Sequence, residues 1–245
     1  MPALVAAFFV TAVLYASVGF GGGSTYTALL ALSDVDYRML PLLALACNIV
    51  VVTGGTVRFA LAGVVPWKGA LSLTALAAPA ALIGGLLPIA ERQFMLLLGF
   101  SLVVAGALLF VPNASQGKGP SRAAKFIPAA AVPLGFLAGM VGIGGGIFLA
   151  PLLHLTRWQG TREIAATASL FILVNSIFGL AGQLMKGDEE RLGVAMQYGL
   201  PLLVAVAVGG QIGSMLAAKR LPVRLIRAGT GALTLYVGAR LLFSL

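Results

Sequence analysis

The sequence predicts an all-α integral membrane protein built from two inverted repeats, each a re-entrant, glycine-broken hairpin plus three transmembrane helices. Three observations predict this fold class: the composition, a duplicated glycine motif and the distribution of basic residues. Hydrophobic residues make up 60% of the 245 residues and charged residues 9%, whereas about a quarter of the residues in soluble domains are charged. Long apolar runs with short polar breaks indicate α-helical membrane spans.

The polar breaks divide the chain into two sets of four apolar segments. The first set covers residues 3–31, 39–57, 69–90 and 94–111, and the second covers 126–155, 164–185, 192–218 and 225–243. We therefore expect an N-terminal transmembrane repeat over residues 1–111, a linker over 112–125 and a C-terminal transmembrane repeat over 126–245. No basic region precedes the first segment, so we interpret it as mature structure and not as a signal peptide.

The longest segment of each half contains a glycine run, VGFGGGSTY at residues 18–26 and VGIGGGIFL at residues 141–149. Other features recur in the same order: Asn48 and Asn175 at the centres of the second and sixth segments, Ile83–Gly84 and Ile212–Gly213, and Gly106 and Gly238. Internal repeats with paired, glycine-interrupted segments are typical of transporters built from two related halves.

The basic residues predict how often each half crosses the membrane, because Lys and Arg collect on the cytoplasmic side. Eight full crossings would place seven and eight basic residues on the two faces, with Arg240 left aside, and so give no bias. Re-entrant glycine-broken segments instead give eleven on one face (Arg58, Lys68, Lys118, Arg122, Lys125, Arg157, Arg162, Lys219, Arg220, Arg224, Arg227) and four on the other (Arg38, Arg92, Lys186, Arg191). Three crossings per half then invert the second half and place both termini outside.

The glycine runs predict an anion site. A run of glycines breaks the helix, frees backbone N–H groups and lets the backbone approach a ligand. The helix that restarts after each run presents an N-terminus with partial positive charge, and inverted halves would bring the two N-termini together near the midplane. The candidate cradle is Gly21, Gly22, Gly23, Ser24 and Thr25 with Gly144, Gly145, Gly146 and Ile147. Close helix packing by small residues is the alternative explanation for these glycines.

Polar residues within the other segments are further candidates. Asn48, Asn175 and Gln211 lie within apolar segments, where each can bond a ligand, an unwound backbone or another helix. All seven Asp and Glu residues lie near segment ends or in connections. An intramembrane carboxylate is usual in proton-coupled carriers, so we expect the membrane potential, inside negative, to drive an anion outward. The single Cys47 excludes a cysteine-clustered metal site, and we expect no cofactor.

The paired GFGGGS and GIGGGI runs, each followed by a central Asn, resemble the TauE/SafE family of sulfite and organosulfonate exporters over nearly the whole chain. The resemblance implies a multi-pass bacterial inner-membrane protein that moves sulfur-containing anions. It also implies that the glycine-run residues form the anion cradle. The two half-sites differ, because Ser24 and Thr25 in the first are Ile147 and Phe148 in the second.

The sequence thus predicts a secondary transporter that exports small sulfur oxyanions, with an anion channel of the same pore as the first alternative. An intramembrane enzyme or a non-transporting scaffold is the other alternative, but one His, one Cys and no intramembrane acid make a poor catalytic set. The expected partners are the lipid bilayer and a small anion, not nucleic acid. A homodimer is left open.

Overall fold

The computed structural model describes residues 1–17, 20–33, 35–110, 121–186, 189–216 and 223–243, with the backbone alone for 189–192 and 223–227. Gly19 and most of the predicted linker lie outside the described residues, as do Lys118, Lys219 and Arg220. The described chain is helical: α1 (Pro2–Ser17), α2 (Gly23–Ala31), α3 (Leu40–Leu61), α4 (Trp67–Leu86), α5 (Glu91–Phe110), the 3₁₀ helix η1 (Arg122–Phe126), α6 (Ile127–Val141), α7 (Gly146–Leu155), α8 (Thr161–Leu184), α9 (Glu189–Leu216) and α10 (Val223–Phe243).

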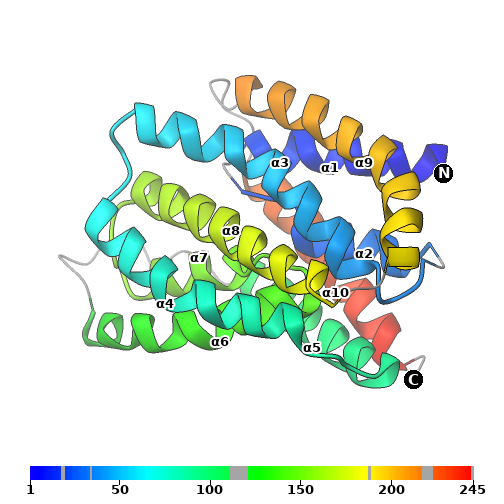
Figure 1. Ribbon diagram of the computed structural model, residues 1–245. Coiled ribbons are helices and arrows are strands. Elements are labelled where there is room, and N and C mark those ends of the chain that lie inside the picture. Colours follow the sequence, from blue (N-terminus) through cyan, green and yellow to red (C-terminus); the bar gives the residue numbers. More distant parts are fainter. Residues whose placement is uncertain (18–19, 34, 111–120, 187–188, 217–222, 244–245) are drawn as a thin grey trace.

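The helices form one bundle in which the two halves of the chain interleave (Figure 1). Helices α3 and α8 pack together, as do α5 and α10, and each of these pairs joins equivalent helices of the two halves. The remaining contacts also come in matched sets, with α4 on α6 and α9 on α1, and with α2 on α3 and α7 on α8. Both termini lie at the same end of the bundle (Figure 1), as the predicted inverted topology requires.

Six helical segments are long and apolar enough to cross a membrane in the described chain: Leu40–Leu61, Trp67–Leu86, Glu91–Phe110, Arg122–Val141, Thr161–Leu184 and Gly193–Leu216. The multi-pass, all-helical class predicted from the sequence is thus confirmed. Helices α2 and α7 have only 9 and 10 residues, about 14–15 Å at 1.5 Å per residue. Each can therefore reach about halfway through a hydrocarbon core of about 30 Å.

Glycines allow the close contacts between the two halves. A methyl group on Gly139 of α6 would collide with the backbone of Ala81 on α4, and one on Gly84 of α4 would collide with the backbone of Phe136 on α6. The second half repeats this contact, because Gly213 of α9 meets the backbone of Val13 on α1 in the same way. Small residues that let helix backbones approach are common in membrane bundles, where the hydrophobic effect does not hold helices together.

Gly139→Leu is expected to lower the apparent melting temperature strongly, because backbone atoms of α4 occupy the space that the new side chain needs. The matched control is Gly54→Ala in α3, where a methyl group would meet only the Gln211 side chain at 3.5 Å. Alanine is favoured over glycine in a helix by about 1 kcal/mol, so this control should be neutral or slightly stabilising. Thermal unfolding in detergent would compare the two, and equal stabilities would contradict the role given to α4–α6 packing.

The contacts also fix which residues of the two halves are equivalent. The nearest neighbours of Gly21 are Asn48, Val52 and Ile172, and those of Gly144 are Ile172, Ser176 and Asn48. Asn48 is therefore equivalent to Ile172, and Val52 to Ser176. The sequence analysis matched Asn48 with Asn175, and this match is wrong by three residues. The reason is physical: Asn175 lies almost one helical turn, about 4.5 Å, beyond Ile172 and so beyond the level of the break glycines.

Candidate functional site

Both glycine runs interrupt a helix, but in different conformations. The second break runs from the end of α6 at Val141 to the start of α7 at Gly146, and Gly142, Gly144 and Gly145 have φ of +84°, +79° and +76°. These angles favour glycine. In the first break Gly22, the N-cap of α2, has φ −102°, which any residue can adopt. Glycine is needed there for space instead.

The two breaks meet each other in the interior. A methyl group on Gly23 would lie 2.5 Å from the Ile143 carbonyl oxygen of the second break and would collide with the Asn48 amide. A methyl group on Gly21 would lie 2.7 Å from Asn48 Oδ1, and one on Gly144 would lie 2.8 Å from Asn48 Nδ2. Asn48 of α3 is therefore in contact with both breaks.

Asn48 is fully buried, and neither Oδ1 nor Nδ2 has a hydrogen-bond partner. Leaving a buried polar group unpaired costs about 1–3 kcal/mol, and more where lipid replaces water outside. An amide held without a partner between two helix breaks is an available donor and acceptor for a ligand. Asn175, Ser176 and Thr167 are also buried with unpaired side-chain atoms.

A cavity of about 200 Å³ lies between the two breaks. It is several times larger than one water molecule needs. Its lining includes Gly21, Gly23 and Ser24 of the first break and Ile143, Gly146 and Ile147 of the second. The remaining lining residues are Tyr15, Phe20, Leu109, Ala150, Pro151, His154, Thr161, Ala165, Ile172 and Thr230. No carboxylate belongs to this lining within the part of the chain that the structure describes.

The N-termini of α2 and α7 supply backbone donors beside this cavity. The first helical hydrogen bond of α2 runs from Tyr26 N–H to the Gly22 carbonyl, 2.8 Å. The N–H groups of Gly23, Ser24 and Thr25 therefore precede it and have no partner within the helix. In α7 the Phe148 and Leu149 N–H groups both donate to the Gly145 carbonyl. Neither helix has a side-chain cap, so both N-termini are open to an anion.

Polar side chains line the cavity mainly on the side of the first break. The hydroxyl groups of Tyr15 and Thr25 are hydrogen-bonded at 2.7 Å, and Tyr15 also interacts with Ser24 and with Thr230 of α10. The second half contributes the apolar side chains of Ile143, Ile147 and Ile172 near the breaks and the polar side chains of His154 and Thr161 further away. The two breaks thus present different side chains to the cavity, Ser24 at the first and Ile147 at the second.

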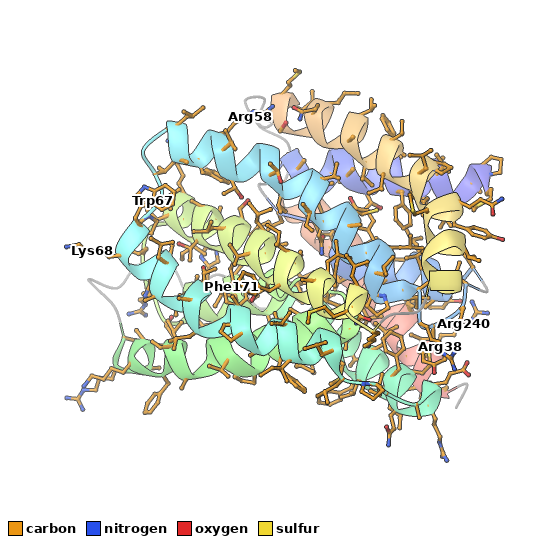
Figure 2. The ribbon with its side chains drawn as sticks, in the orientation of Figure 1. Arg38, Arg58, Trp67, Lys68, Phe171 and Arg240 are labelled. Carbon is orange, nitrogen blue, oxygen red and sulfur yellow. The ribbon has the colours of Figure 1, made fainter. Side chains whose placement is uncertain are left out.

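Charged side chains mark the two ends of the bundle. Trp67 and Lys68 lie at one end and Arg38 and Arg240 at the other, with Phe171 between them (Figure 2). Gly145 of the second break packs on Phe171, because a methyl group on Gly145 would lie 2.9 Å from the Phe171 ring. From the breaks the cavity extends toward the end of the bundle with Trp67 and Lys68. Its lining includes His154 and Thr161, which lie on either side of the connection between α7 and α8. Trp158 of this connection packs on Gly69, next to Lys68.

A second, larger cavity of about 460 Å³ lies toward the end with Arg38. Arg38 and Lys186 line it, as do Pro41 and Met140, which lie next to the second break. Lys186 Nζ donates to Gln183 Oε1 at 3.0 Å, and Gln183 Nε2 donates to the Gly139 carbonyl at 3.1 Å. The two cavities thus lie on opposite sides of the point where the breaks meet.

The structure brings together most of the sequence-predicted site residues, but not all. Gly21, Gly23, Ser24, Gly146 and Ile147 line the cavity. Thr25 bonds to the lining residue Tyr15, and Gly144 contacts Asn48. Gly22 packs on Tyr26 and Thr11, and Gly145 on Phe171.

Two predicted residues lie elsewhere. Gln211 is exposed on α9 and accepts a hydrogen bond from Arg58 at 2.9 Å, and Asn175 is not among the nearest neighbours of the described break glycines. The sequence analysis missed Tyr15, Ile172, Thr230 and the role of His154 at the cavity.

The described helices form a multi-pass membrane bundle with a cavity between two interrupted helices. The family model described as Sulfite exporter TauE/SafE matches residues 4–241, and the chain belongs to this family. Membership confirms the resemblance seen in the sequence, and the family is one of transporters and not of enzymes.

Several curated proteins are similar to the chain. A probable membrane transporter protein of Sinorhizobium fredii is 34% identical over 98% of this chain and 97% of that protein. A probable membrane transporter protein of Methanocaldococcus jannaschii is 23% identical over 92% of this chain and 91% of that protein. Sulfite exporter TauE/SafE family protein 1 of Arabidopsis thaliana is 33% identical over 42% of this chain and 22% of that protein. No solved structure matches the chain.

Proposed function

We propose that the protein is a secondary transporter of the bacterial inner membrane that exports a small sulfur-containing oxyanion. The main support is that two uncapped helix N-termini adjoin one cavity, and that the unpartnered amide of Asn48 contacts glycines of both breaks. Backbone N–H groups and helix dipoles favour an anion. The family description, Sulfite exporter TauE/SafE, supports a sulfur oxyanion in particular.

The depth of the site supports alternating access through inverted repeats. Helices α2 and α7 each reach about halfway through a bilayer, and the cavities lie on opposite sides of their meeting point. The positive-inside rule places the end with Lys68 in the cytoplasm. An anion would then enter from the cavity at His154, bind between the breaks and leave past Arg38 and Lys186 after the breaks rearrange.

The membrane potential would drive this export. No carboxylate that could carry a coupling proton lines the central cavity in the described chain. One charge that moves through 100 mV gains about 2.3 kcal/mol, which supports an equilibrium gradient of about fiftyfold for a monoanion. A dianion gains about twice that energy.

Proteoliposomes that contain the purified protein and are loaded with labelled sulfite or an organosulfonate test the proposal. A potassium diffusion potential, negative inside, should accelerate efflux, and the opposite potential should slow it. Liposomes without protein are the control. Lack of potential-dependent efflux for every sulfur oxyanion would overturn the proposal, and unitary currents in planar bilayers would show a channel instead.

A further inference from the structure

We infer that His154 receives the anion at the cytoplasmic end of the central cavity, and that the charge on its imidazole sets how fast the cavity is loaded. Export is then faster at low pH, where the imidazole is a cation, than at high pH. This inference rests on the proposed function and adds a substrate-contacting residue and a form of regulation to the same site.

His154 lies on the face of α7 that lines the central cavity. Four lining residues of this helix follow one another at helical spacing: Ile147, Ala150, Pro151 and His154. Residues three and four apart share a face of a helix, so the cavity runs along α7. From Ile147 to His154 the helix rises about 10 Å at 1.5 Å per residue. His154 is partly exposed, so the breaks form one end of the cavity and the imidazole lies at the other.

The two cavities are equivalent entrances of the inverted halves. Asn48 of α3 is equivalent to Ile172 of α8, because each packs on Gly21 and Gly144. Counting back along the two helices by the same number of residues makes Pro41 equivalent to Ala165. Pro41 lines the second cavity and Ala165 lines the central cavity. Each half therefore forms one entrance, and the two entrances open toward opposite ends of the bundle.

The charges of the two entrances differ in kind. Arg38 and Lys186 line the second cavity, and both side chains are cations at any physiological pH. Among the described residues that line the central cavity, His154 alone can carry a positive charge. Imidazole is the side chain whose charge ordinarily changes between about pH 5 and about pH 8. The cytoplasmic entrance thus has the charge that responds to pH.

Other charged groups surround this entrance but do not line it. Helix α7 makes its main contacts with α8, α5 and α6. Helix α6 has no charged residue, and Glu91 and Arg92 of α5 lie near Phe94, which lines the second cavity. The charged residues of α8 and the adjoining connections at the His154 end are Arg122, Lys125, Arg157, Arg162 and Glu163. None of these belongs to the lining of the central cavity, so they act on His154 as a constant background.

A pH profile of efflux tests the inference. Radiolabelled methanesulfonate is the probe, because a sulfonate keeps its charge between about pH 5.5 and about pH 8, where imidazole changes its own. Proteoliposomes have the same pH on both sides, so the orientation of the protein does not matter, and a fixed potential, negative inside. Efflux should fall about fivefold across this range, because a charge-assisted hydrogen bond is about twice as strong as a neutral one.

Two variants fix the charge at this position. His154→Gln should give slow efflux at every pH, and His154→Arg should give fast efflux at every pH. Lys68→Gln is the matched control, because it removes one positive charge at the same end of the bundle (Figure 2) but from a residue outside the lining. This control should keep the pH profile of the unmodified protein.

A binding measurement tests the contact without transport. The chain contains one histidine, so protein labelled at histidine and purified without a histidine tag gives imidazole NMR signals from His154 alone. Sulfite or methanesulfonate, added in detergent at constant pH and ionic strength, should shift these signals, and chloride at the same concentration should not.

Three results would overturn the inference and leave the proposed function intact: efflux independent of pH in the unmodified protein, an unchanged pH profile in His154→Gln, or imidazole signals that do not respond to an anion that the protein exports. If sulfite is exported and methanesulfonate is not, the imidazole signals with sulfite decide the inference. Absence of efflux for every sulfur oxyanion would overturn both the inference and the proposed function.

Discussion

Replacement of Asn48 by leucine is expected to stop transport while it raises the thermal stability of the protein. The amide is fully buried and has no hydrogen-bond partner, so removing it relieves a desolvation cost of about 1–3 kcal/mol. Leucine has the same branched shape. A hydrogen bond to a charged group contributes about 1.5–3 kcal/mol, so its loss should slow transport by about 10- to 100-fold.

Opposite changes in stability and activity distinguish a ligand-binding residue from a structural one. Thr167→Val is the matched control, because Thr167 is also fully buried with an unpaired hydroxyl but, unlike Asn48, is not a near neighbour of the break glycines. This control should gain stability and keep its transport rate. The measurements are melting temperature in detergent and initial efflux rate in proteoliposomes. If Asn48→Leu lost stability, the amide would instead have a partner in the folded protein.

Gly144→Ala is expected to reduce transport by at least about tenfold and to lower stability. Alanine at φ +79° costs about 1–2 kcal/mol. The added methyl group would also lie 2.8 Å from Asn48 Nδ2 and 3.0 Å from Ile172 Cγ2, so it would push apart the two residues that define the halves of the site.

Gly63→Ala separates these two effects. Gly63 has φ +65°, but no atom lies within 4 Å of a built methyl group. This variant therefore carries the backbone cost without the steric contact, and it should lose stability but transport normally. Equal transport losses in the two variants would show that backbone strain alone matters and that the meeting of the breaks at Gly144 does not.

The positions of polar residues within an apolar segment predict equivalent residues of the two halves less well than the glycine motifs do. Asn48 and Asn175 both fall at the centre of a segment, and position within the segment suggested that they are equivalent. Equivalence in the fold depends on which residue lies level with the break, and a residue three positions further along a helix keeps nearly the same face but lies about 4.5 Å beyond that level. The contacts of Gly21 and Gly144 assign the equivalent position to Ile172.

Gln211 shows a similar limit. It lies well inside a long apolar segment of the sequence, and this position suggested a buried amide. Helix α9 packs on α1 and α3, but Gln211 is exposed and accepts a hydrogen bond from Arg58 of α3. Hydropathy averages over both faces of a helix, so it could not distinguish a residue that faces a cavity from one at the bundle surface.

The sequence by itself determined the membrane class, the positions of the helices and the two glycine breaks. These depend on local chemistry: apolar runs must be helical in lipid because their backbone groups need partners, and glycine runs interrupt helices. The meeting of the two breaks at Asn48, the equivalence of Asn48 and Ile172, and the residues that line the cavity follow from the packing of the helices. These properties depend on contacts between residues about a hundred or more positions apart, such as Asn48 and Gly144, which arise only when the two halves pack together.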